Sequence, residues 1–500
     1  MAERPSDSGD QPELPFIIGI LGDFVGHGTA PRLADRGFVD IDAASFAAVF
    51  RTLGPSLTLT VDNALQADGT MLQIALRFTA LDDFGPDGVA RQLQPLAAAL
   101  GERARPAGTT GLFDQLLRQG GSSPLDQAIA ATQHGKAAPV DSRLVRQIEA
   151  IRHDPAFRQL EASWRGLHLL VSRSAGVQTR LFQASEDELA KALRSDPDSL
   201  FEQLMNDAPL GLLLGDYAFS HEPQPVETLG LLADLAASAA VPMLAGISSR
   251  LFGVDRLADL AKLRDGDLRR SFDRPDFAKW RSLRDRDEAR YLTLVLPRIA
   301  VGPADGGPVW VNGAYLLAAR MAESFAATGW CLALEGPAGR FEPELEIEGE
   351  REALLSKLGL VSLARPRASG ELQFFGLQTL QKPREYDDPA ISRNAALATE
   401  LPCLMAMARC IQGIAALGGD ALAAGVSLDE CAARLNGWIG RFVGSEPDLV
   451  STGDPGRPLR EARITVATAA DRTIYAEARI WPRLPRQTLS AALKLRVPLS

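Results

Sequence analysis

Residues 210–216 read LGLLLGD, an apolar run that is closed by a glycine and an acid. A short continuous apolar run bounded by turn residues is typical of a strand that is buried on both faces of a sheet. Residues 226–240 follow with helical periodicity, and residues 241–247 are apolar again. Because buried strands alternate here with helices, this stretch predicts an α/β fold in which helices cover a sheet.

The same alternation extends on both sides of this stretch. Residues 144–172 have a strongly helical pattern, and residues 291–296 form another apolar run. A helix is expected over residues 311–327, followed by a strand over residues 330–334. These signals predict a large, multi-lobed α/β module over residues 141–500, with mixed sheets flanked by helices.

The N-terminal part predicts a smaller α+β module over residues 16–105. It contains a buried strand, an amphipathic helix and two alternating runs, at residues 16–21, 43–53, 57–61 and 72–78. Asp68 and Gly69 lie between the alternating runs, and this dipeptide is a strong signal for a hairpin turn.

Two segments have the composition of tails and linkers. Residues 1–15 are rich in Pro, Asp and Ser and are expected to be disordered. Residues 106–140 contain several Gly and Pro and are expected to link the modules. One short amphipathic helix lies inside the linker, with its apolar side chains at Leu112, Phe113, Leu116 and Leu117. Such a helix either docks on its own protein or is displayed to a partner, and both alternatives remain open.

The C-terminus has a different pattern, with apolar residues at alternate positions. These residues are Leu489, Leu493, Leu495, Val497 and Leu499. The pattern predicts a strand that ends the chain. Since an open strand edge is an aggregation hazard, this strand is expected to be paired in a sheet.

Composition narrows the class of protein. The 500 residues are 46% hydrophobic and carry a formal net charge of −10, with both signs dispersed. No apolar run reaches the ~20 residues that cross a bilayer, so a cytoplasmic chain without membrane insertion is expected. The acidic balance disfavours nucleic acid as a partner. The four cysteines form no CxxC pair, which favours reduced, buried thiols.

A search for chemistry finds no catalytic, cofactor or metal site. The loop from Gly22 to Thr29 is glycine-rich and follows a strand, but it lacks the lysine and the spacing of a phosphate-binding loop. No two histidines have the spacing of a helical zinc pair. The carboxylate clusters adjoin basic residues or helix starts, where caps and ion pairs explain them. The chain is therefore not expected to be an enzyme.

Two groups of motifs resemble the contractile sheath of bacterial type VI secretion systems. Gly22-Asp23-Phe24 and Asp82-Asp83-Phe84 resemble the small sheath subunit (TssB/VipA-like), and Trp164-Arg165-Gly166 resembles the large one (TssC/VipB-like, EvpB family). Further positions that resemble the large subunit are Gly215, Asp216, Trp280, Arg281, Tyr291, Pro297, Arg298, Asn312, Trp330, Phe375, Gly376, Lys382 and Pro383. The resemblance implies a natural fusion of the two subunits.

The resemblance also implies a function. It predicts a structural protomer with a sheath-subunit fold, which forms a helical homopolymer around an inner tube protein and contracts to drive protein translocation. A baseplate and an AAA+ unfoldase of the ClpV type are the implied partners. Leu112, Phe113, Leu116 and Leu117 are the implied unfoldase contact, and the residues from Leu489 to Leu499 form an inter-protomer strand. Whether a separate small subunit is also needed remains open.

Two alternatives to this function are retained. One is a scaffold of the same apparatus that does not polymerise. The other is a nucleotide-dependent enzyme that uses the loop from Gly22 to Thr29.

Overall fold

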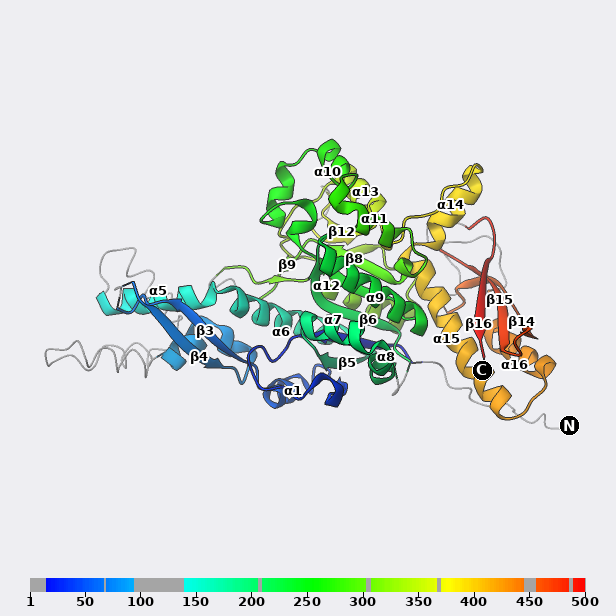
Figure 1. Ribbon diagram of the computed structural model, residues 1–500, viewed down its shortest axis with the longest axis horizontal. Coiled ribbons are helices and arrows are strands. Elements are labelled where there is room, and N and C mark those ends of the chain that lie inside the picture. The colour runs from blue at the N-terminus through cyan, green and yellow to red at the C-terminus, as the bar shows by residue number, and fades with distance from the viewer. Residues whose placement is uncertain are drawn as a thin grey trace.

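The computed structural model describes residues 15–66, 69–93, 139–205, 209–302, 307–366, 370–444, 456–484 and 489–499. Within these ranges the buried apolar side chains form three clusters. Figure 1 shows an elongated molecule with a large sheet at its centre, a narrow extension on one side and the C-terminal strands on the other. This arrangement of helices around sheets confirms the predicted mixed α/β fold.

Nine strands of the described chain form the large sheet, in the order β11-β13-β12-β8-β7-β6-β1-β5-β2. Their bounds are β1 (Ile17–Gly22), β2 (Val39–Asp40), β5 (Gln178–Gln183), β6 (Leu212–Phe219), β7 (Met243–Ile247), β8 (Leu292–Leu296), β11 (Gly336–Gly339), β12 (Leu360–Ala364) and β13 (Leu372–Phe374). The strands from β12 to β5 run parallel. The strands at the two edges are antiparallel to their neighbours.

The central strands are buried on both faces. Ile18 and Ile20 of β1 belong to one apolar cluster, whereas Ile17 and Leu21 belong to the other. Parallel strands covered by helices on both sides have this property, because neither face meets water. It explains why these strands appear in the sequence as continuous apolar runs.

Strand β1 lies between β5 and β6 in the interior of the sheet. Ile17 is opposite Gln178 of β5, and Ile18 is opposite Leu212 of β6. The first strand of the chain is therefore enclosed by strands from the part beyond residue 141. The division into modules at residues 16–105 and 141–500 stays a prediction, since both parts contribute to one sheet.

Helices cover both faces of the sheet. Their bounds are α1 (Phe46–Leu53), α5 (Pro139–Arg152), α6 (Pro155–Arg173), α7 (Glu186–Ser195), α8 (Pro197–Met205), α9 (Pro223–Ala239), α10 (Asp265–Ser271), α11 (Ala278–Arg284), α12 (Ala314–Thr328) and α13 (Gly349–Lys357). Short 3-10 helices occupy Leu33–Asp35, Leu81–Phe84, Ser249–Phe252, Leu257–Lys262, Pro275–Phe277 and Glu288–Tyr291. The buried residues of α6 and α12 belong to one apolar cluster, and those of α7, α9 and α11 belong to the other.

The narrow extension consists of the predicted hairpin and a helix. Strands β3 (Ser56–Asp62) and β4 (Met71–Arg77) pair antiparallel, and α5 lies against them. Figure 1 shows these elements projecting away from the large sheet. A second small pair, β9 (Ile299–Ala300) and β10 (Trp310–Val311), lies near α6.

The C-terminal lobe packs three strands on helices. It consists of α14 (Pro389–Ala398), α15 (Leu401–Ala423), α16 (Leu428–Gly440), β14 (Leu459–Thr468), β15 (Ile474–Pro482) and β16 (Leu493–Pro498). The strands form an antiparallel sheet in the order β14-β15-β16. Among the described helices, α15 alone is long and apolar enough to cross a membrane, and 67% of its most apolar window is buried inside the protein.

Local chemistry sets the ends of the helices. The Asp154 side chain accepts hydrogen bonds from the amides of Ala156 (2.8 Å) and Phe157 (3.3 Å), and Pro155 occupies the first turn of α6. The predicted helix over residues 144–172 is therefore divided into α5 and α6 at this point, because an N-cap residue and a proline together start a new helix.

The strand that was expected over residues 330–334 is not formed in the described chain. Residues 330–334 were predicted to form a strand, but within the described chain they make no strand ladder, and β11 follows at Gly336. Trp330, Cys331 and Leu334 are buried all the same. The apolar run reflects burial against helices α12 and α15, which the local pattern does not distinguish from a buried strand.

Candidate assembly site

The small-subunit-like and large-subunit-like motifs meet where β1 ends. The indole Nε1 of Trp164 donates a 2.9 Å hydrogen bond to the carbonyl oxygen of Phe24, and the two rings pack edge to face at 5.4 Å. The rings of Phe46 and Phe50 from α1 pack on the same indole. Both Trp164 and Phe24 are fully buried. A large aromatic side chain of α6 thus anchors the strand, the loop after it and α1.

The loop after β1 is held by its own polar groups. Asp23 Oδ1 accepts hydrogen bonds from the amides of Val25 (3.2 Å) and Gly26 (2.9 Å) and from Nε2 of Gln183 (2.9 Å). Gln183 Oε1 in turn accepts from the Phe24 amide at 2.6 Å. Gly26 has a φ of +66°, a backbone conformation that favours glycine. The motif Gly22-Asp23-Phe24 therefore builds a tight turn that β5 secures.

The same loop has little capacity to bind a phosphate. A phosphate-binding loop directs free backbone amides at its ligand. Here the amides of residues 24–26 donate to Gln183 and Asp23, the His27 amide donates to the Ser56 carbonyl at 2.9 Å, and the Gly28 amide donates to the Val25 carbonyl at 3.3 Å. Thr58 N also donates to Nδ1 of His27 at 3.0 Å. The loop's donors stabilise its contact with β3.

A buried carboxyl group lies beside this junction. Asp216 is on β6, next to Gly215, and its Oδ2 atom has no hydrogen-bond partner. Burial raises the pKa of Asp216 to about 6, although the polar side chains of Ser163, Tyr315 and Asn312 act in the opposite direction. The charged form of this carboxyl therefore opposes folding at neutral pH.

Gly166 allows two helices to approach closely. A Cβ atom at this position would lie only 2.4 Å from the ring of Tyr315 on α12. Arg165, the residue before Gly166, forms a buried ion pair with Glu161 one turn earlier on α6, with an N–O distance of 2.7 Å. The Arg165 guanidinium lies against Gly302, where a Cβ atom would meet Cζ at 3.1 Å. The Trp164-Arg165-Gly166 motif thus contacts the loop after β1, helix α1, helix α12 and the segment at Gly302.

Asn312, two residues before the start of α12, completes the junction. Its Oδ1 atom accepts from the Ala314 amide at 2.9 Å, and its Nδ2 atom donates to the Tyr217 carbonyl at 3.3 Å. The structure therefore brings together motif positions from residues 22–24, 164–166, 215–216 and 312.

The motif at residues 82–84 closes the core of the hairpin. Burial of the Asp83 carboxyl acts to raise its pKa, but hydrogen bonds from Thr79 and Ala80 outweigh this effect and lower the pKa. Phe84 is fully buried and stacks on Phe78 with ring centroids 4.1 Å apart. Asp82 lies in the first turn of the same 3-10 helix.

The remaining motif positions lie away from the junction and support loops. Trp280 is fully buried, and its Nε1 atom has no partner. Arg281 donates to the carbonyls of Phe272 (2.7 Å) and Arg274 (2.8 Å). Arg298 forms an ion pair of 2.7 Å with Glu344.

Other positions of this group secure the backbone around β8, β12 and β13. The Gly376 amide donates to Glu352 at 2.9 Å, and the Lys382 amide donates to the Arg284 carbonyl at 2.8 Å. Tyr291 ends a 3-10 helix before β8, Pro297 follows β8, and Phe375 and Pro383 adjoin Gly376 and Lys382 in sequence. Trp330 lies under the Arg409 guanidinium at 5.3 Å.

The C-terminal segment is placed in a sheet of its own chain. Leu493, Leu495 and Val497 lie on β16, which pairs with β15, and Leu499 packs near Gly418 of α15. Leu489 precedes the strand, and its carbonyl accepts a 3.1 Å hydrogen bond from Nε1 of Trp481. Only one edge of β16 is paired in the described chain.

The sequence analysis missed two structurally important glutamines, and one of its predicted sites lies outside the described residues. Gln183 secures the loop after β1, and Gln147 of α5 is fully buried against the hairpin. Gln147 lies in the same helical stripe as Leu144, Ile148 and Ile151, and a polar residue in that stripe was the available signal. The candidate unfoldase contact at residues 112–117 lies outside the described residues.

Within the described ranges no three His, Cys, Asp or Glu side chains are grouped as metal ligands. The four cysteines are buried.

Three family models match this chain. The model for the type VI secretion system protein VipA (VC_A0107 or Hcp2) covers residues 3–108. The model for the EvpB/VC_A0108 tail sheath N-terminal domain covers residues 135–304, and that for the EvpB/VC_A0108 tail sheath gpW/gp25-like domain covers residues 390–499. Together these matches define a tail-sheath protein.

Individual relatives agree with the family models. The sheath protein TssC1 of Pseudomonas aeruginosa is 29% identical over 419 residues, which cover 72% of this chain and 84% of the relative. The sheath protein TssB1 of the same organism is 31% identical over 133 residues, covering 25% of this chain and 77% of the relative. The chain belongs to the type VI secretion system sheath family, with TssB-like and TssC-like parts in one polypeptide.

A solved structure shows a more distant likeness. The contracted helical sheath of the anti-feeding prophage aligns with a TM-score of 0.35 and 13% identity over 67% of this chain and 77% of that one. Family membership is established by sequence, and it defines this chain as a self-polymerising sheath protomer with a structural and not an enzymatic role.

Proposed function

We propose that this chain alone supplies the building unit of a contractile sheath that surrounds an inner tube in the cytoplasm and drives protein translocation by contracting. The observation that carries the proposal is the position of β1 between β5 and β6. The curated relatives are a TssB1 and a TssC1 protein, and here their counterparts share one sheet. A covalent unit of this kind needs no separate small subunit.

The unit has three proposed parts. Residues 16–105 form the small-subunit-like module, residues 106–140 form a tether, and residues 141–500 form the large-subunit-like module, after a tail at residues 1–15. The tether contains about 35 residues, and a flexible chain of that length spans roughly 30–35 Å. That reach is compatible with docking of the two modules within one chain.

Strand β16 is the proposed inter-protomer element. Its apolar residues belong to the cluster that covers α15, and within the described chain its outer edge has no strand partner. Strand addition at such an edge joins chains by main-chain hydrogen bonds. These bonds would hold protomers together while other contacts break and reform during contraction. The residues assigned to this strand are Leu489, Leu493, Leu495, Val497 and Leu499.

The proposed partners follow from the family. They are an inner tube protein, a baseplate and an AAA+ unfoldase of the ClpV type. The unfoldase is proposed to bind the apolar positions Leu112, Phe113, Leu116 and Leu117. A Leu116→Asp variant should weaken binding of the unfoldase N-terminal domain to tubes without preventing tube formation.

Electron microscopy of the purified chain tests the proposal. The full chain should form tubes in negative stain, whereas a chain that ends at residue 486 should remain folded by circular dichroism and form none. Monodisperse particles of the full chain would instead support a scaffold that does not polymerise. Normal tubes from the shortened chain would exclude β16 as the linking strand.

The enzymatic alternative has its own test. ATP and GTP turnover should be absent from the purified chain and from the His27→Ala and Thr29→Ala variants. Turnover by the wild type that either substitution abolishes would restore the nucleotide-dependent enzyme.

A further inference from the structure

One face of the C-terminal sheet carries a row of like charges. Arg463 of β14 is directly opposite Arg479 of β15, and Arg479 is directly opposite Lys494 of β16. All three side chains are exposed. Like charges directly opposite one another in adjacent strands destabilise a sheet. This row therefore opposes the folding of the isolated protomer.

Two further cations enlarge this face. Arg496 lies over the ring of Tyr475 at 3.9 Å, and Arg460 lies over the ring of Trp481 at 4.7 Å. Glu461 and Glu477 lie on the same face, and Glu477 is directly opposite Arg496, but within the described chain neither forms an ion pair with any of these five cations. The cationic face is defined here as Arg460, Arg463, Arg479, Lys494 and Arg496. Two of these five cations, Arg460 and Arg496, are held over aromatic rings by cation–π contacts.

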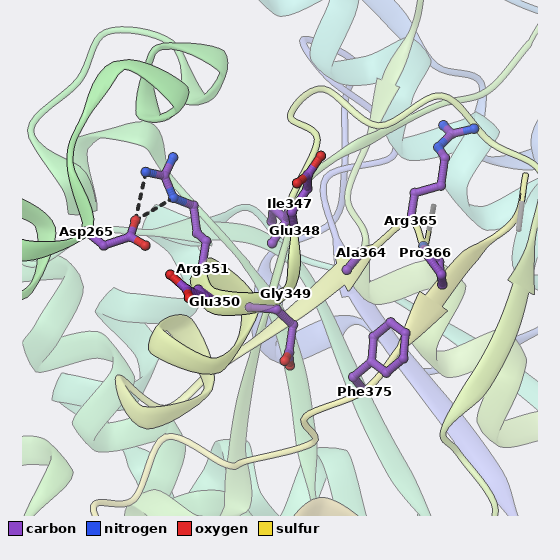
Figure 2. A pocket seen from close by; sticks show the side chains of 11 residues that line it. Asp265, Ile347, Glu348, Gly349, Glu350, Arg351, Ala364, Arg365, Pro366 and Phe375 are labelled. Atoms are coloured by element: carbon purple, nitrogen blue, oxygen red, sulfur yellow. Dashed lines mark hydrogen bonds and ion pairs between the residues drawn. The ribbon is translucent and has the colours of Figure 1, made fainter. Parts of the chain in front are cut away.

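A groove with the opposite charge lies on another part of the molecule. It has a volume of about 650 Å³ and lies between α10, the start of α13 and the loops around β12 and β13. Acidic side chains in its lining outnumber basic ones by four to two; the acids are Asp265, Glu348, Glu350 and Glu352. Figure 2 shows Asp265 and Arg351 on one side of this acidic groove, with Arg365, Pro366 and Phe375 on the other.

The two arginines of the acidic groove are already neutralised. Arg351 forms an ion pair with Asp265 at 2.8 Å and donates to the carbonyls of Leu260 and Leu263. Arg365 is within ion-pair distance of Glu342 (3.4 Å) and Glu346 (3.2 Å) on the rim. The acidic side chains that line the groove therefore outnumber the basic ones.

The rim arises from a repeated sequence pattern. Glutamates occupy every second position from residue 342 to residue 352, while Pro343, Leu345 and Ile347 between them are buried. The backbone of this segment bonds to the β8–β9 region, because the Glu344 amide donates to the Arg298 carbonyl at 2.9 Å. The chain before α13 leaves Glu342, Glu346 and Glu348 exposed, whereas Glu350 and Glu352 lie in the first turn of α13.

Together these observations define two complementary surfaces that do not overlap. In Figure 1 the strands β14–β16 lie at one end of the molecule, whereas α10 and α13 lie on a lobe above the large sheet. A contact between two different surfaces of identical chains is heterologous, and such contacts generate open helical polymers when the rotation does not close.

We propose that the cationic face of one protomer docks on the acidic groove of a second copy of this chain. The proposal rests on the sheath function, since it requires a polymer. Phe375 supplies an aromatic surface on which an incoming guanidinium can stack, beside the acids of the groove. The acids of the groove would compensate the repulsion within the row of Arg463, Arg479 and Lys494, and docking would therefore favour the assembled state over the free protomer.

Charge reversal in the full chain tests this contact. The first variant carries Arg479→Glu and Lys494→Glu, the second carries Glu348→Arg and Glu350→Arg, and the third combines all four. Lys191→Glu, which reverses an exposed charge on α7, is the control. Circular dichroism and size exclusion verify folding before tube formation is measured by pelleting and negative stain at several protein and salt concentrations.

The first and second variants should each raise the protein concentration needed for tubes by roughly tenfold or more, as close interfacial charge pairs do. The combined variant should recover most of this loss, and the control should resemble the wild type. Higher salt should weaken wild-type assembly.

Three results would overturn the contact. Wild-type assembly by either reversal variant would show that these charges are not at an interface. Impaired reversal variants without recovery in the combined variant would assign the cationic face to a different acidic partner, such as the inner tube. A wild-type chain that forms no tubes under any condition would overturn the proposed sheath function, and this contact with it.

Discussion

The indole nitrogen of Trp164 donates a hydrogen bond of 2.9 Å to the carbonyl oxygen of Phe24, which lies 140 positions earlier in the chain. Both residues are fully buried. Substituting Trp164→Phe should destabilise the protein by about 1–3 kcal/mol beyond the effect of lost volume, because the Phe24 carbonyl would be buried without a partner. Urea unfolding of the full chain measures this change.

The matched control for Trp164 is Trp280→Phe. Trp280 is also fully buried, but its Nε1 atom has no hydrogen-bond partner, so this variant loses similar volume and no hydrogen bond. Equal destabilisation by the two substitutions would contradict a stabilising role for the bond to Phe24.

The buried carboxyl of Asp216 predicts a pH dependence of stability. Its pKa is raised from 3.8 to about 6 by burial, so the protonated form is favoured in the folded state. The stabilisation from proton binding is complete below pH ~4 and is lost as pH rises through about 6. The shift of roughly two units corresponds to about 3 kcal/mol.

Asp216→Asn should therefore be more stable than the wild type at pH 7.5, and its advantage should shrink by about 3 kcal/mol as pH falls to 4. Chemical unfolding at a series of pH values measures this advantage, with the exposed Asp198→Asn as a control. Wild-type and Asp216→Asn stabilities that remain parallel across this range would refute the prediction.

Substitution of Gln147 should weaken the turn of the β3–β4 hairpin, to which its side chain is hydrogen-bonded. Its Nε2 atom donates to the Asp62 carbonyl at 3.0 Å, and its Oε1 atom accepts from the Ala64 amide at 2.8 Å. Gln147→Ala should cost about 2–3 kcal/mol, because two hydrogen bonds are lost inside a buried contact. Hydrogen exchange should show faster exchange at the Ala64 amide.

The control for this variant is Gln73→Ala on the exposed side of β4. Unchanged protection at Ala64 in the Gln147→Ala protein would mean that the backbone, and not this side chain, holds the turn.

Because β1 is paired with β5 and β6, we expect the tether to be dispensable once the protein has folded. Cleavage at a protease site introduced at residues 120–124 should leave both fragments together in dilute buffer. Residues Ile17–Gly22 pair with β5, and part of the same strand pairs with β6, so separation would break the interior of a sheet. Size exclusion after cleavage provides the measurement.

A second variant identifies the cause of that association. Ile20→Pro in the cleaved protein should release the N-terminal fragment, because proline cannot donate to a sheet ladder and is excluded from central strands. Prompt dissociation of the unsubstituted fragments would show that β1 does not hold the halves together.

Local patterns in the sequence predicted some elements well. The alternation over residues 57–61 and 72–78, with Asp68-Gly69 between them, identified the hairpin formed by β3 and β4. Period-2 spacing identified β16, since the face with Leu493, Leu495 and Val497 is half-buried to buried and the opposite face is exposed. In both cases the evidence lies within a few consecutive residues.

Features that depend on distant residues could not be predicted in this way. The run at residues 16–21 indicated a buried strand but not its neighbours, because parallel pairing leaves no local signal in the chain. The row of Arg463, Arg479 and Lys494 depends on the register of three strands, which the sequence does not specify by itself. The bond between Trp164 and Phe24 likewise requires the tertiary structure.

The position of β1 has a consequence for synthesis of the protein. Residues Ile17–Gly22 leave the ribosome early, but their partners β5 and β6 end at Gln183 and Phe219. At typical rates of translation, roughly 10–40 s separate these events. During that interval the nascent chain holds an apolar strand without its neighbours, a state that chaperones bind. Expression of this protomer should therefore be more sensitive to chaperone supply and to the speed of translation than to its final stability.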